Sequence, residues 1–552
     1  MMSKLPDWRS VFPLLHPRPE QEQALDYIID QFYNQDVNYV VTELGTGVGK
    51  SAIAVTLARW LAQNASCLKS ADIIYDDAPK TYVLTSQKLL QDQYVRDFPS
   101  HARDLRSSSN YSCGWMPNQT CAETLRIERA FAGRKCLNNI NCANSLGGCP
   151  YKIGKKAFRD HWLGVTNYSY FINEATYVNS LGQRELIVFD ESHNVEAEIR
   201  SWATISFNEE FAKRELKLSF PSSRNDDGFK KWVEERYAPA LSRLISTTLL
   251  NIEKHVATSK FDSKLQALTR KYELLDKHIC QVNRFVQEIA GDRNNYLVIW
   301  GDEKGKKTIQ LKPLNITWQA RSVLYSGGRK RLFMSATILD MKTFSRTIGI
   351  PEDEKVGFIN IPSPFPTKNR PIYFLPSGNM AKAKIDQSLP NIVNSIKNIL
   401  DIHKEDRGLI HCHTYKIAKY IDDNVKNSRL LLHDSGSRES TLKQHCDGIL
   451  PTVLLSPSMT EGVDLAEDKS RFQVICKIPY PYIGDDVVAA KMKEDPDWYN
   501  WITARTIIQA IGRSVRSSTD QAVTYILDDG WKFFYQKNRK FFPRDFDILL
   551  QK

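Results

Sequence analysis

The sequence predicts an α/β protein that contains two parallel β-sheets, and three observations lead to this fold class. Residues 39–61 run from an apolar strand through a glycine-rich turn into a helix whose apolar residues recur at helical spacing. A second strand–helix pair, TYVLTSQKLLQDQYV, follows at residue 81. The chain beyond residue 345 repeats the alternation of strand-like and helical segments. Such alternation is typical of parallel sheets with covering helices.

The glycine-rich turn, VVTELGTGVGKS, is typical of a phosphate-binding loop. Its glycines let backbone N–H groups point at a phosphate with no Cβ in the way, and the following helix offers its positive end. We expect Lys50 to reach the outer phosphates and Ser51 to hold Mg²⁺. A glycine-rich turn ahead of an ordinary helix is the alternative, which the strand–loop–helix context disfavours. The predicted loop residues are Gly45, Thr46, Gly47, Val48, Gly49, Lys50 and Ser51.

Composition indicates an ordinary globular protein of several domains. The chain has 552 residues, of which 42% are hydrophobic and 25% charged. No apolar run approaches the roughly 18 residues that span a bilayer, and the polar start MMSKLPDWRS lacks a signal-peptide core. We therefore expect a cytosolic protein without membrane association. The net charge of +11 is compatible with an anionic polymer as partner, although charge alone decides little.

Half of the ten cysteines fall in one short segment, between Cys113 and Cys149. This segment is rich in Asn, Ser and Gly and has little periodicity, so it cannot bury enough apolar surface to order itself. In a reducing compartment such a cluster is more typical of metal binding than of disulfides. The spacing is too loose for paired C-x₂-C zinc ribbons; it leaves zinc and unligated thiols open and favours an iron–sulfur cluster. The five cysteines are Cys113, Cys121, Cys136, Cys142 and Cys149.

Two acids follow the strand in ELIVFDESHN. Ligand sites of open α/β sheets lie at the carboxyl ends of strands, which is where Asp190 and Glu191 stand. Asp190 is suited to position Mg²⁺ on a nucleotide, and Glu191 to orient or deprotonate an attacking water. Acids at a strand end are more often solvated loop residues, but the phosphate-binding loop reverses that balance.

Two further segments are candidates for contacts with a nucleotide. In RPEQ, Arg18 and Gln21 stand at a helix start, where they suit an adenine edge and equally a capped surface helix. After the strand RLFMSATI, Ser335 and Thr337 are suited to relay nucleotide state to a neighbouring surface, or to act as simple caps.

The second half supplies its own candidates. Asp464 lies at a strand-to-loop junction in TEGVDL. The segment QAIGRSVRS predicts one helix that carries Gln509, Arg513 and Arg516. Arg513 and Arg516 would share a helical face and meet a γ-phosphate across a cleft. The strand-like segments are PIYFLP, GLIHCHT, RLLLHD, TVLLSPSMTEGVDL, FQVICKIP and AVTYILDD.

Two other regions are structural in this interpretation. Residues 205–290 show long polar segments with helical spacing and predict a largely helical insertion, closed by the strands NYLVIW and TIQLKPL. The tail WKFFYQKNRKFFPRDFDILL interleaves basic and aromatic residues. Docking on the second domain is favoured there over nucleic-acid stacking.

Taken in order, RPEQ, GTGVGKS, TSQKLLQDQ, the cysteine insert, DESH, SAT, EGVDL and QAIGRSVR resemble the superfamily 2 DNA helicases of the XPD/DinG family. The segments NYSCGW, GGCPY and TNYSYF resemble the flanks of that family's iron–sulfur insert. The resemblance implies two RecA-like motor domains, with a cluster domain and a helical arch inserted in the first. It also implies a 4Fe-4S cluster held by Cys113, Cys136, Cys142 and Cys149, with Cys121 as a spare that replaces Cys136 in the alternative assignment.

By the same resemblance, ATP and Mg²⁺ are the cofactors, and single-stranded and forked DNA are the partners. The residues Lys50, Ser51, Asp190, Glu191, Gln509, Arg513 and Arg516 would assemble the ATP site between the motor domains. We expect a five-prime to three-prime motor that is monomeric and meets repair or replication proteins. It would lie in the cytoplasm, on the nucleoid, or in host cytoplasm if viral. The predicted domains are 1–104, 165–204 and 316–345 for the first motor, 105–164 for the cluster, 205–315 for the arch and 346–552 for the second motor.

Two rival functions are weaker. A nucleic-acid-binding scaffold that only senses ATP needs no water-orienting acid, so Glu191 disfavours it. An RNA remodeller is disfavoured by the flanks of the cysteines.

Overall fold

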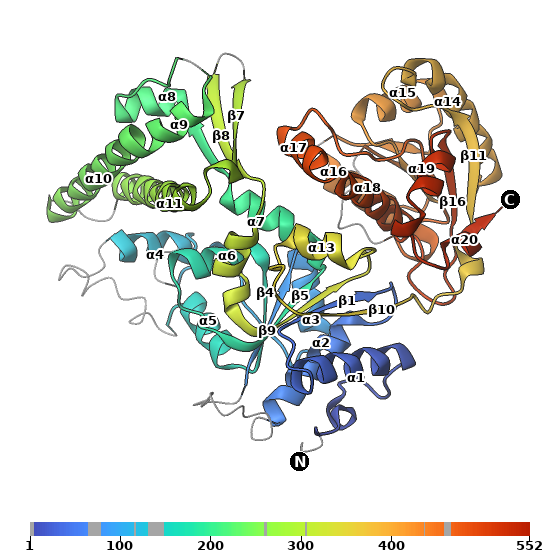
Figure 1. Ribbon diagram of the computed structural model, residues 1–552, viewed down its shortest axis with the longest axis horizontal. Coiled ribbons are helices and arrows are strands. Elements are labelled where there is room, and N and C mark those ends of the chain that lie inside the picture. The colour runs from blue at the N-terminus through green and yellow to red at the C-terminus, as the bar shows by residue number, and fades with distance from the viewer. Residues whose placement is uncertain are drawn as a thin grey trace.

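The computed structural model of the chain describes residues 5–64, 79–114, 118–130, 148–222, 224–258, 262–303, 306–434, 436–457 and 465–551. Figure 1 shows two α/β domains and a third body of long helices with a small sheet. The two domains each contain a seven-stranded sheet whose strands all pair in parallel, which confirms the predicted fold class. Within the described ranges, no helix combines the length and apolar character that crossing a membrane requires.

The first domain has the strand order β10-β1-β9-β5-β2-β4-β3. Both β1 and β5 are buried along their whole length, as expected where helices cover both faces of a parallel sheet. The strands are β1 (Tyr39–Leu44), β2 (Thr81–Thr85), β3 (Arg103–Asp104), β4 (Leu163–Asn167), β5 (Arg184–Asp190), β9 (Gly328–Ser335) and β10 (Val356–Ile361).

The strand β10 corrects a predicted domain boundary. The sequence pattern places the end of the first domain at residue 345, yet β10 pairs with β1, with Val356 opposite Tyr39 and Ile361 opposite Leu44. The first domain therefore extends to Ile361. Only two of the six residues of this edge strand are buried, so it lacks the continuous apolar run that marks the central strands.

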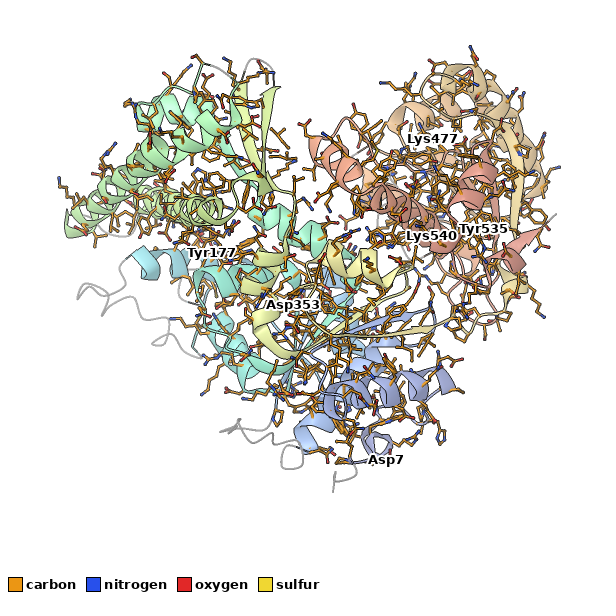
Figure 2. The ribbon with its side chains drawn as sticks, in the orientation of Figure 1. Asp7, Tyr177, Asp353, Lys477, Tyr535 and Lys540 are labelled. Carbon is orange, nitrogen blue, oxygen red and sulfur yellow. The ribbon has the colours of Figure 1, made fainter. Side chains whose placement is uncertain are left out.

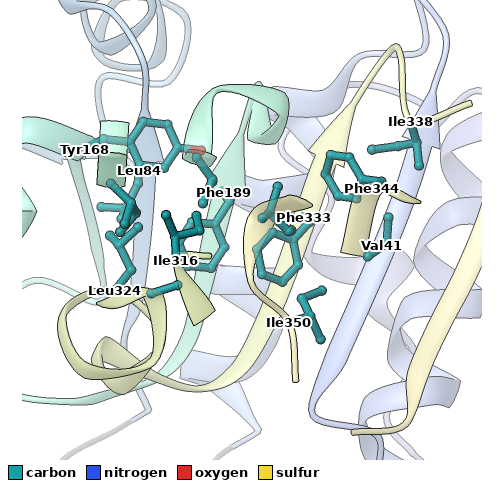
Figure 3. Packing of buried hydrophobic residues seen from close by; sticks show 14 of the residues in the cluster. Val41, Leu84, Tyr168, Phe189, Ile316, Leu324, Phe333, Ile338, Phe344 and Ile350 are labelled. Atoms are coloured by element: carbon teal, nitrogen blue, oxygen red, sulfur yellow. The ribbon is translucent and has the colours of Figure 1, made fainter. Parts of the chain in front are cut away.

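Helices cover both faces of this sheet. Successive residues of a strand point to opposite faces, so Val40 and Val41 belong to different core clusters. Figure 3 shows the cluster that contains Val41. In this cluster Phe189 of β5 and Phe333 of β9 stack with ring centroids 4.6 Å apart. Burying each such ring contributes roughly 1.5–3 kcal/mol. The helices are α1 (Pro19–Tyr33), α2 (Lys50–Gln63), α3 (Lys88–Asp97), α6 (Tyr168–Tyr177), α7 (Val195–Ala203), α12 (Thr317–Val323) and α13 (Met341–Ile348).

The chain leaves the sheet after β3 and returns at β4. The described part of this insert contains α4 (Cys121–Ala130) and α5 (Pro150–Asp160). Cys113 and Cys149 are within the described residues, whereas Cys136 and Cys142 lie outside them.

The third body is inserted between α7 and α12. It has an antiparallel sheet in the order β6-β8-β7, and its long helix α11 meets α4 through an ion pair between Arg126 and Glu273. Its elements are β6 (Ile205–Asn208), α8 (Glu209–Phe211), α9 (Asp226–Trp232), α10 (Ala238–Thr258), α11 (Ser263–Gly291), β7 (Tyr296–Glu303) and β8 (Lys306–Pro313).

The second domain has the strand order β13-β14-β12-β15-β16-β11-β17. Each strand-like segment of the sequence overlaps one of these strands, and β17 is the strand that those segments leave out. Its strands are β11 (Ile372–Gly378), β12 (Gly408–His411), β13 (Leu430–Leu432), β14 (Val453–Ser456), β15 (Phe472–Ile475), β16 (Val523–Asp528) and β17 (Leu550–Gln551). Its helices are α14 (Ile385–Ile402), α15 (Tyr415–Val425), α16 (Arg438–Asp447), α17 (Asp486–Glu494), α18 (Pro496–Ile511), α19 (Trp531–Lys537) and α20 (Phe546–Leu549).

The C-terminal tail packs on the second domain, as its pattern indicates. Trp531, Phe534 and Phe546 are buried there. Tyr535 and Lys540 lie on the same domain in Figure 2.

The two domains meet through α18. The Trp501 indole donates to the carbonyl of Ile338 at 2.9 Å, and Trp498 and Trp501 share a core cluster with Ile338 and Phe344 of the first domain. The strand ends of the first domain therefore face α18 of the second.

Candidate nucleotide site

The loop between β1 and α2 has the backbone geometry of a phosphate cradle. Gly47 and Gly49 have φ angles of +94° and +89°, a region that residues with a Cβ rarely occupy. Helix α2 begins at Lys50, so its unpaired N–H groups and the positive end of its dipole adjoin the loop. An anion bound here meets hydrogen-bond donors.

The segment after β10 lies across this loop. Its prolines, in SPFP, are the only feature of the sequence that indicates a special segment there. The Ser363 hydroxyl donates to the carbonyl of Thr46 at 2.7 Å. A Cβ on Gly45 would lie 2.2 Å from the Ser363 nitrogen, and one on Gly47 would lie 2.2 Å from the Phe365 ring. Both glycines are therefore required by space, and Gly47 also by its conformation.

Arg18 and Gln21 lie against the same loop. The Arg18 guanidinium donates to the carbonyl of Gly47, and the Gln21 side-chain amide donates to that of Gly49 at 3.5 Å. The Gln21 carbonyl oxygen also accepts from the Arg18 N–H at 2.9 Å, which caps α1. The same two residues of RPEQ therefore cap α1 and contact the phosphate loop.

The acids after β5 face the loop. Lys50 Nζ lies 3.2 Å from Glu191 Oε1. Burial alone raises the pKa of Glu191, but the charges of Lys50, His193 and Arg516 together bring that pKa below its usual range. Burial and the neighbouring Glu191 raise the pKa of Asp190. The two carboxyl groups therefore sit in different electrostatic environments, although they are adjacent in sequence.

Ser51 and Asp190 converge on one buried hydroxyl. Tyr94, on α3, is 1% exposed and donates to Asp190 Oδ2 at 3.1 Å, and its hydroxyl also bonds to the Ser51 side chain. The Tyr94 hydroxyl thus connects the two side chains predicted to hold Mg²⁺, and oxygen ligands of this kind suit that ion. Tyr94 has no motif signal, so the sequence pattern does not reveal its role.

A chain of polar side chains leads from Glu191 to the second domain. His193 Nδ1 lies 3.4 Å from Glu191 Oε2 and 3.0 Å from the Ser335 hydroxyl. Ser335 and Thr337 are 3.5 Å apart through their hydroxyl oxygens, and the Gln509 amide donates to Thr337 at 3.0 Å. Ser335 and Thr337 therefore stand between the acids and α18, and His193 is a link that the pattern DESH alone leaves unassigned.

The prediction that Arg513 and Arg516 share a helical face is wrong. Helix α18 ends at Ile511 with Gly512 as its C-cap, so both arginines lie in the following loop. Glycine readily ends a helix, and the buried Ser514 hydroxyl then bonds to Ser470 at 2.7 Å, which holds the loop against its own domain.

The two arginines occupy different surroundings. The Arg516 charge acts on the pKa values of Lys50 and Glu191, which places it at the loop of the first domain. The Arg513 charge acts on the pKa of His411 inside the second domain. Arg516 therefore lies near the phosphate loop and Glu191. The other predicted contact of this domain, Asp464, lies outside the described residues.

Three cysteines of the insert lie close together. Cys149 Sγ is 3.7 Å from Cys121 Sγ, and Cys113 lies near enough for its charge to affect the pKa of Cys121. Cys121, predicted as the spare, is thus in contact with Cys149. In the described ranges no group of three metal-ligating side chains is arranged to hold an ion, so the cluster is not confirmed.

Comparison with family models finds two matches. The model described as "Type III restriction enzyme, res subunit" matches residues 14–220, and the model described as "Helicase C-terminal domain" matches residues 396–546. The first match contains the phosphate loop and the paired acids, and the second contains Gln509 and Arg516.

Curated relatives include ATP-dependent DNA helicases. DinG of Photobacterium profundum is 25% identical over 248 residues, which cover 41% of this chain and 35% of the relative. The chain thus spans about a third of the length of that relative. YoaA of Escherichia coli is 20% identical, with 89% of this chain and 88% of the relative covered.

Among solved structures, one titled as an XPD helicase superposes with a TM-score of 0.59 at 16% identity and covers 96% of this chain and 98% of its own. At this identity the likeness concerns the fold.

Proposed function

We propose that this chain, an XPD/DinG-like superfamily 2 helicase by motif order, domain matches and fold, hydrolyses ATP in the seam between its α/β domains to move along single-stranded DNA. One observation carries the proposal. Lys50 and Glu191 of the first domain are in contact, and the charge of Arg516 from the second domain acts on both. A seam lined from both sides is what a nucleotide-driven motor needs, because hydrolysis then changes how the two sides hold together.

Each residue has a role in this reaction. The loop N–H groups bind the phosphates, and Lys50 turns from Glu191 to the outer phosphates. Glu191, then released, accepts a hydrogen bond from the attacking water and orients it. Arg516 stabilises the charge that develops on the transferred phosphoryl group. Ser51 and Asp190 would hold Mg²⁺, which neutralises phosphate charge when bound.

The polar chain from Glu191 to Gln509 supports coupling of this site to movement. Loss of the γ-phosphate changes the partners of Glu191, and His193, Ser335 and Thr337 connect that acid to Gln509. The two domains would thereby alternate between a closed and an open seam. Repeated closing and opening would shift their grips on a phosphate backbone in the five-prime to three-prime direction.

DNA is the proposed track because the similar proteins DinG and YoaA are named as DNA helicases. The net charge of +11 is favourable for any phosphate backbone. The third body would act as the arch and, with the cysteine insert, as a wedge at a fork. The protein would work as a monomer in the cytoplasm or on the nucleoid, beside repair or replication proteins.

The cysteine insert would carry a 4Fe-4S cluster. Cys113, Cys136, Cys142 and Cys149 are the proposed ligands, and Cys121 is the alternative to Cys136. The proximity of the three described thiols fits a shared thiolate site. Anaerobic purification should give a brown protein that contains iron. A colourless preparation that contains zinc would contradict the assignment.

The test of the motor is Lys50→Ala. The variant should lose DNA-stimulated ATPase and unwinding, because the outer phosphates lose their cationic partner, while circular dichroism stays unchanged. Wild-type assays with DNA and RNA forks, tailed on either strand, give the substrate and the direction. Full activity of Lys50→Ala would refute the site, and equal unwinding of RNA forks would favour the RNA remodeller.

A further inference from the structure

A buried cluster of three charged side chains joins the two α/β domains away from the phosphate loop. We define the docking cluster as Glu196 and Arg200 of α7 with Lys491 of α17. Lys491 Nζ contacts Glu196 Oε1, and Arg200 Nη2 donates to the same oxygen at 2.6 Å. These side chains are 11%, 15% and 13% exposed for Glu196, Arg200 and Lys491. An ion pair crossing the seam is thus largely shielded from water.

The docking cluster stands on the element that links the catalytic acid to the third body. Helix α7 begins at Val195, just after the DESH segment, and ends at Ala203, just before β6. Arg200 also donates to the carbonyls of Pro313 and Leu314, where the chain returns from β8. One side chain therefore ties together the outgoing and returning connections of the third body.

On the other side of the seam, Lys491 is held by its own domain. Its Nζ lies 4.6 Å from the ring centroid of Trp498 in α18, and α17 also lies close to β7 of the third body. Burial lowers the pKa of Lys491. Burial raises the pKa of Glu196, but the charges of Lys491 and Arg200 lower it, and the result is a pKa below the usual value. Two basic side chains thus share one carboxylate.

We propose that the docking cluster positions the second domain for ATP hydrolysis. The contact of Lys491 with Glu196 sets the closed seam in which the Arg516 charge acts on Lys50 and Glu191, and Arg200 transmits the same movement to the base of the third body. This inference rests on the proposed function. Lys491 is a positioning residue, since it acts through Arg516.

The charges of the docking cluster predict how strongly each variant impairs closure of the seam. An ion pair with a purely structural role does not predict this order. In Lys491→Met the apolar stem still packs on Trp498, and Arg200 still neutralises Glu196, so the fold should persist while the seam loosens. In Glu196→Gln two cations face each other without a carboxylate, so closure should suffer more. The double variant removes that repulsion and should recover to the level of Lys491→Met.

The experiment compares these variants with Lys493→Met, a matched control that removes an exposed lysine from the same helix. We expect Lys491→Met to lower kcat for DNA-stimulated ATP hydrolysis about tenfold with KM for ATP nearly unchanged, the size of a coupling between contacting residues. Lys491→Arg should restore kcat. Hydrogen exchange of residues 306–316 should speed up in Lys491→Met and not in Lys493→Met.

A second measurement separates this inference from the proposed function. Fluorescence energy transfer between dyes on the two α/β domains, with a non-hydrolysable ATP analogue and single-stranded DNA, reports closure without turnover. A wild type that closes but does not hydrolyse ATP contradicts the proposed function only. Equal closure in Lys491→Met and Lys493→Met, or a Glu196→Gln variant no worse than Lys491→Met, overturns the docking cluster. Should Glu196→Gln fail to fold, the two lysine variants decide.

Discussion

Removal of one buried hydroxyl should weaken the response of the motor to magnesium. Tyr94→Phe deletes the group that donates to Asp190 at 3.1 Å and bonds to Ser51, and it leaves the ring in place. A hydrogen bond to an ionised carboxylate contributes roughly 1.5–3 kcal/mol, which is about ten- to hundredfold in an equilibrium. Asp190 keeps its bond from the Glu191 N–H at 3.1 Å, so we expect an effect at the lower end of this range.

The Mg²⁺ concentration at half-maximal ATPase should therefore rise about tenfold, with kcat at saturating Mg²⁺ changed by less than about threefold. Binding of a fluorescent ATP analogue, titrated with Mg²⁺, gives the same shift without turnover. Tyr82→Phe is the matched control, because its buried hydroxyl donates to the Leu181 carbonyl at 2.7 Å in the same domain. An identical Mg²⁺ dependence in wild type and Tyr94→Phe would refute the reasoning.

Three further predictions follow from the geometry. Gly47→Ala combines an unfavourable backbone conformation with a clash against Phe365, so it should cost roughly 1–3 kcal/mol in thermal unfolding and abolish binding of the ATP analogue; unchanged binding would contradict the cradle. Arg516→Ala should lower kcat by at least about a hundredfold and more than Arg513→Ala does, since the Arg516 charge acts on Glu191 whereas the Arg513 charge acts on His411; the reverse order would exchange their roles. His278 lies in α11, with its Nε2 2.9 Å from the Tyr237 hydroxyl. Burial lowers its pKa from 6.5 to about 4, so the stability that its neutral form contributes is complete above pH 6.5 and is lost as the pH falls toward 4. Urea midpoints should show this loss, and His278→Gln should flatten the slope.

Local patterns predict much of this molecule because many of its signals are local. The phosphate loop needs glycines, a strand before it and a helix after it, all within one short segment, and the structure has Gly47 and Gly49 in the expected conformations. The strands of the second domain are short apolar runs bounded by polar turns, so each one is visible in the sequence. The acids at the end of β5 follow from the same logic.

The misses have a tertiary origin. β10 is an edge strand with few buried residues, so nothing local distinguishes it from a linker. Tyr94 and Phe365 act on the loop from distant segments, and no spacing rule connects them to it. The helical spacing of QAIGRSVRS predicts that the helix continues past Gly512. In the structure the chain turns there, and the Ser514 hydroxyl bonds to Ser470. Cys136, Cys142 and Asp464 stay predictions, since they lie outside the described residues.

The order of strands in the first sheet has a consequence for biosynthesis. Tyr39 of β1 pairs with Arg331 on one side and Val356 on the other, so a ribosome releases the strand that carries the phosphate cradle long before either neighbour exists. Pairings this distant along the chain are slow to form and leave an apolar strand exposed to aggregation meanwhile. A polypeptide terminated before β9 would therefore contain the phosphate loop but lack both strands that pair with β1. We expect chaperones to bind such a fragment and proteases to degrade it.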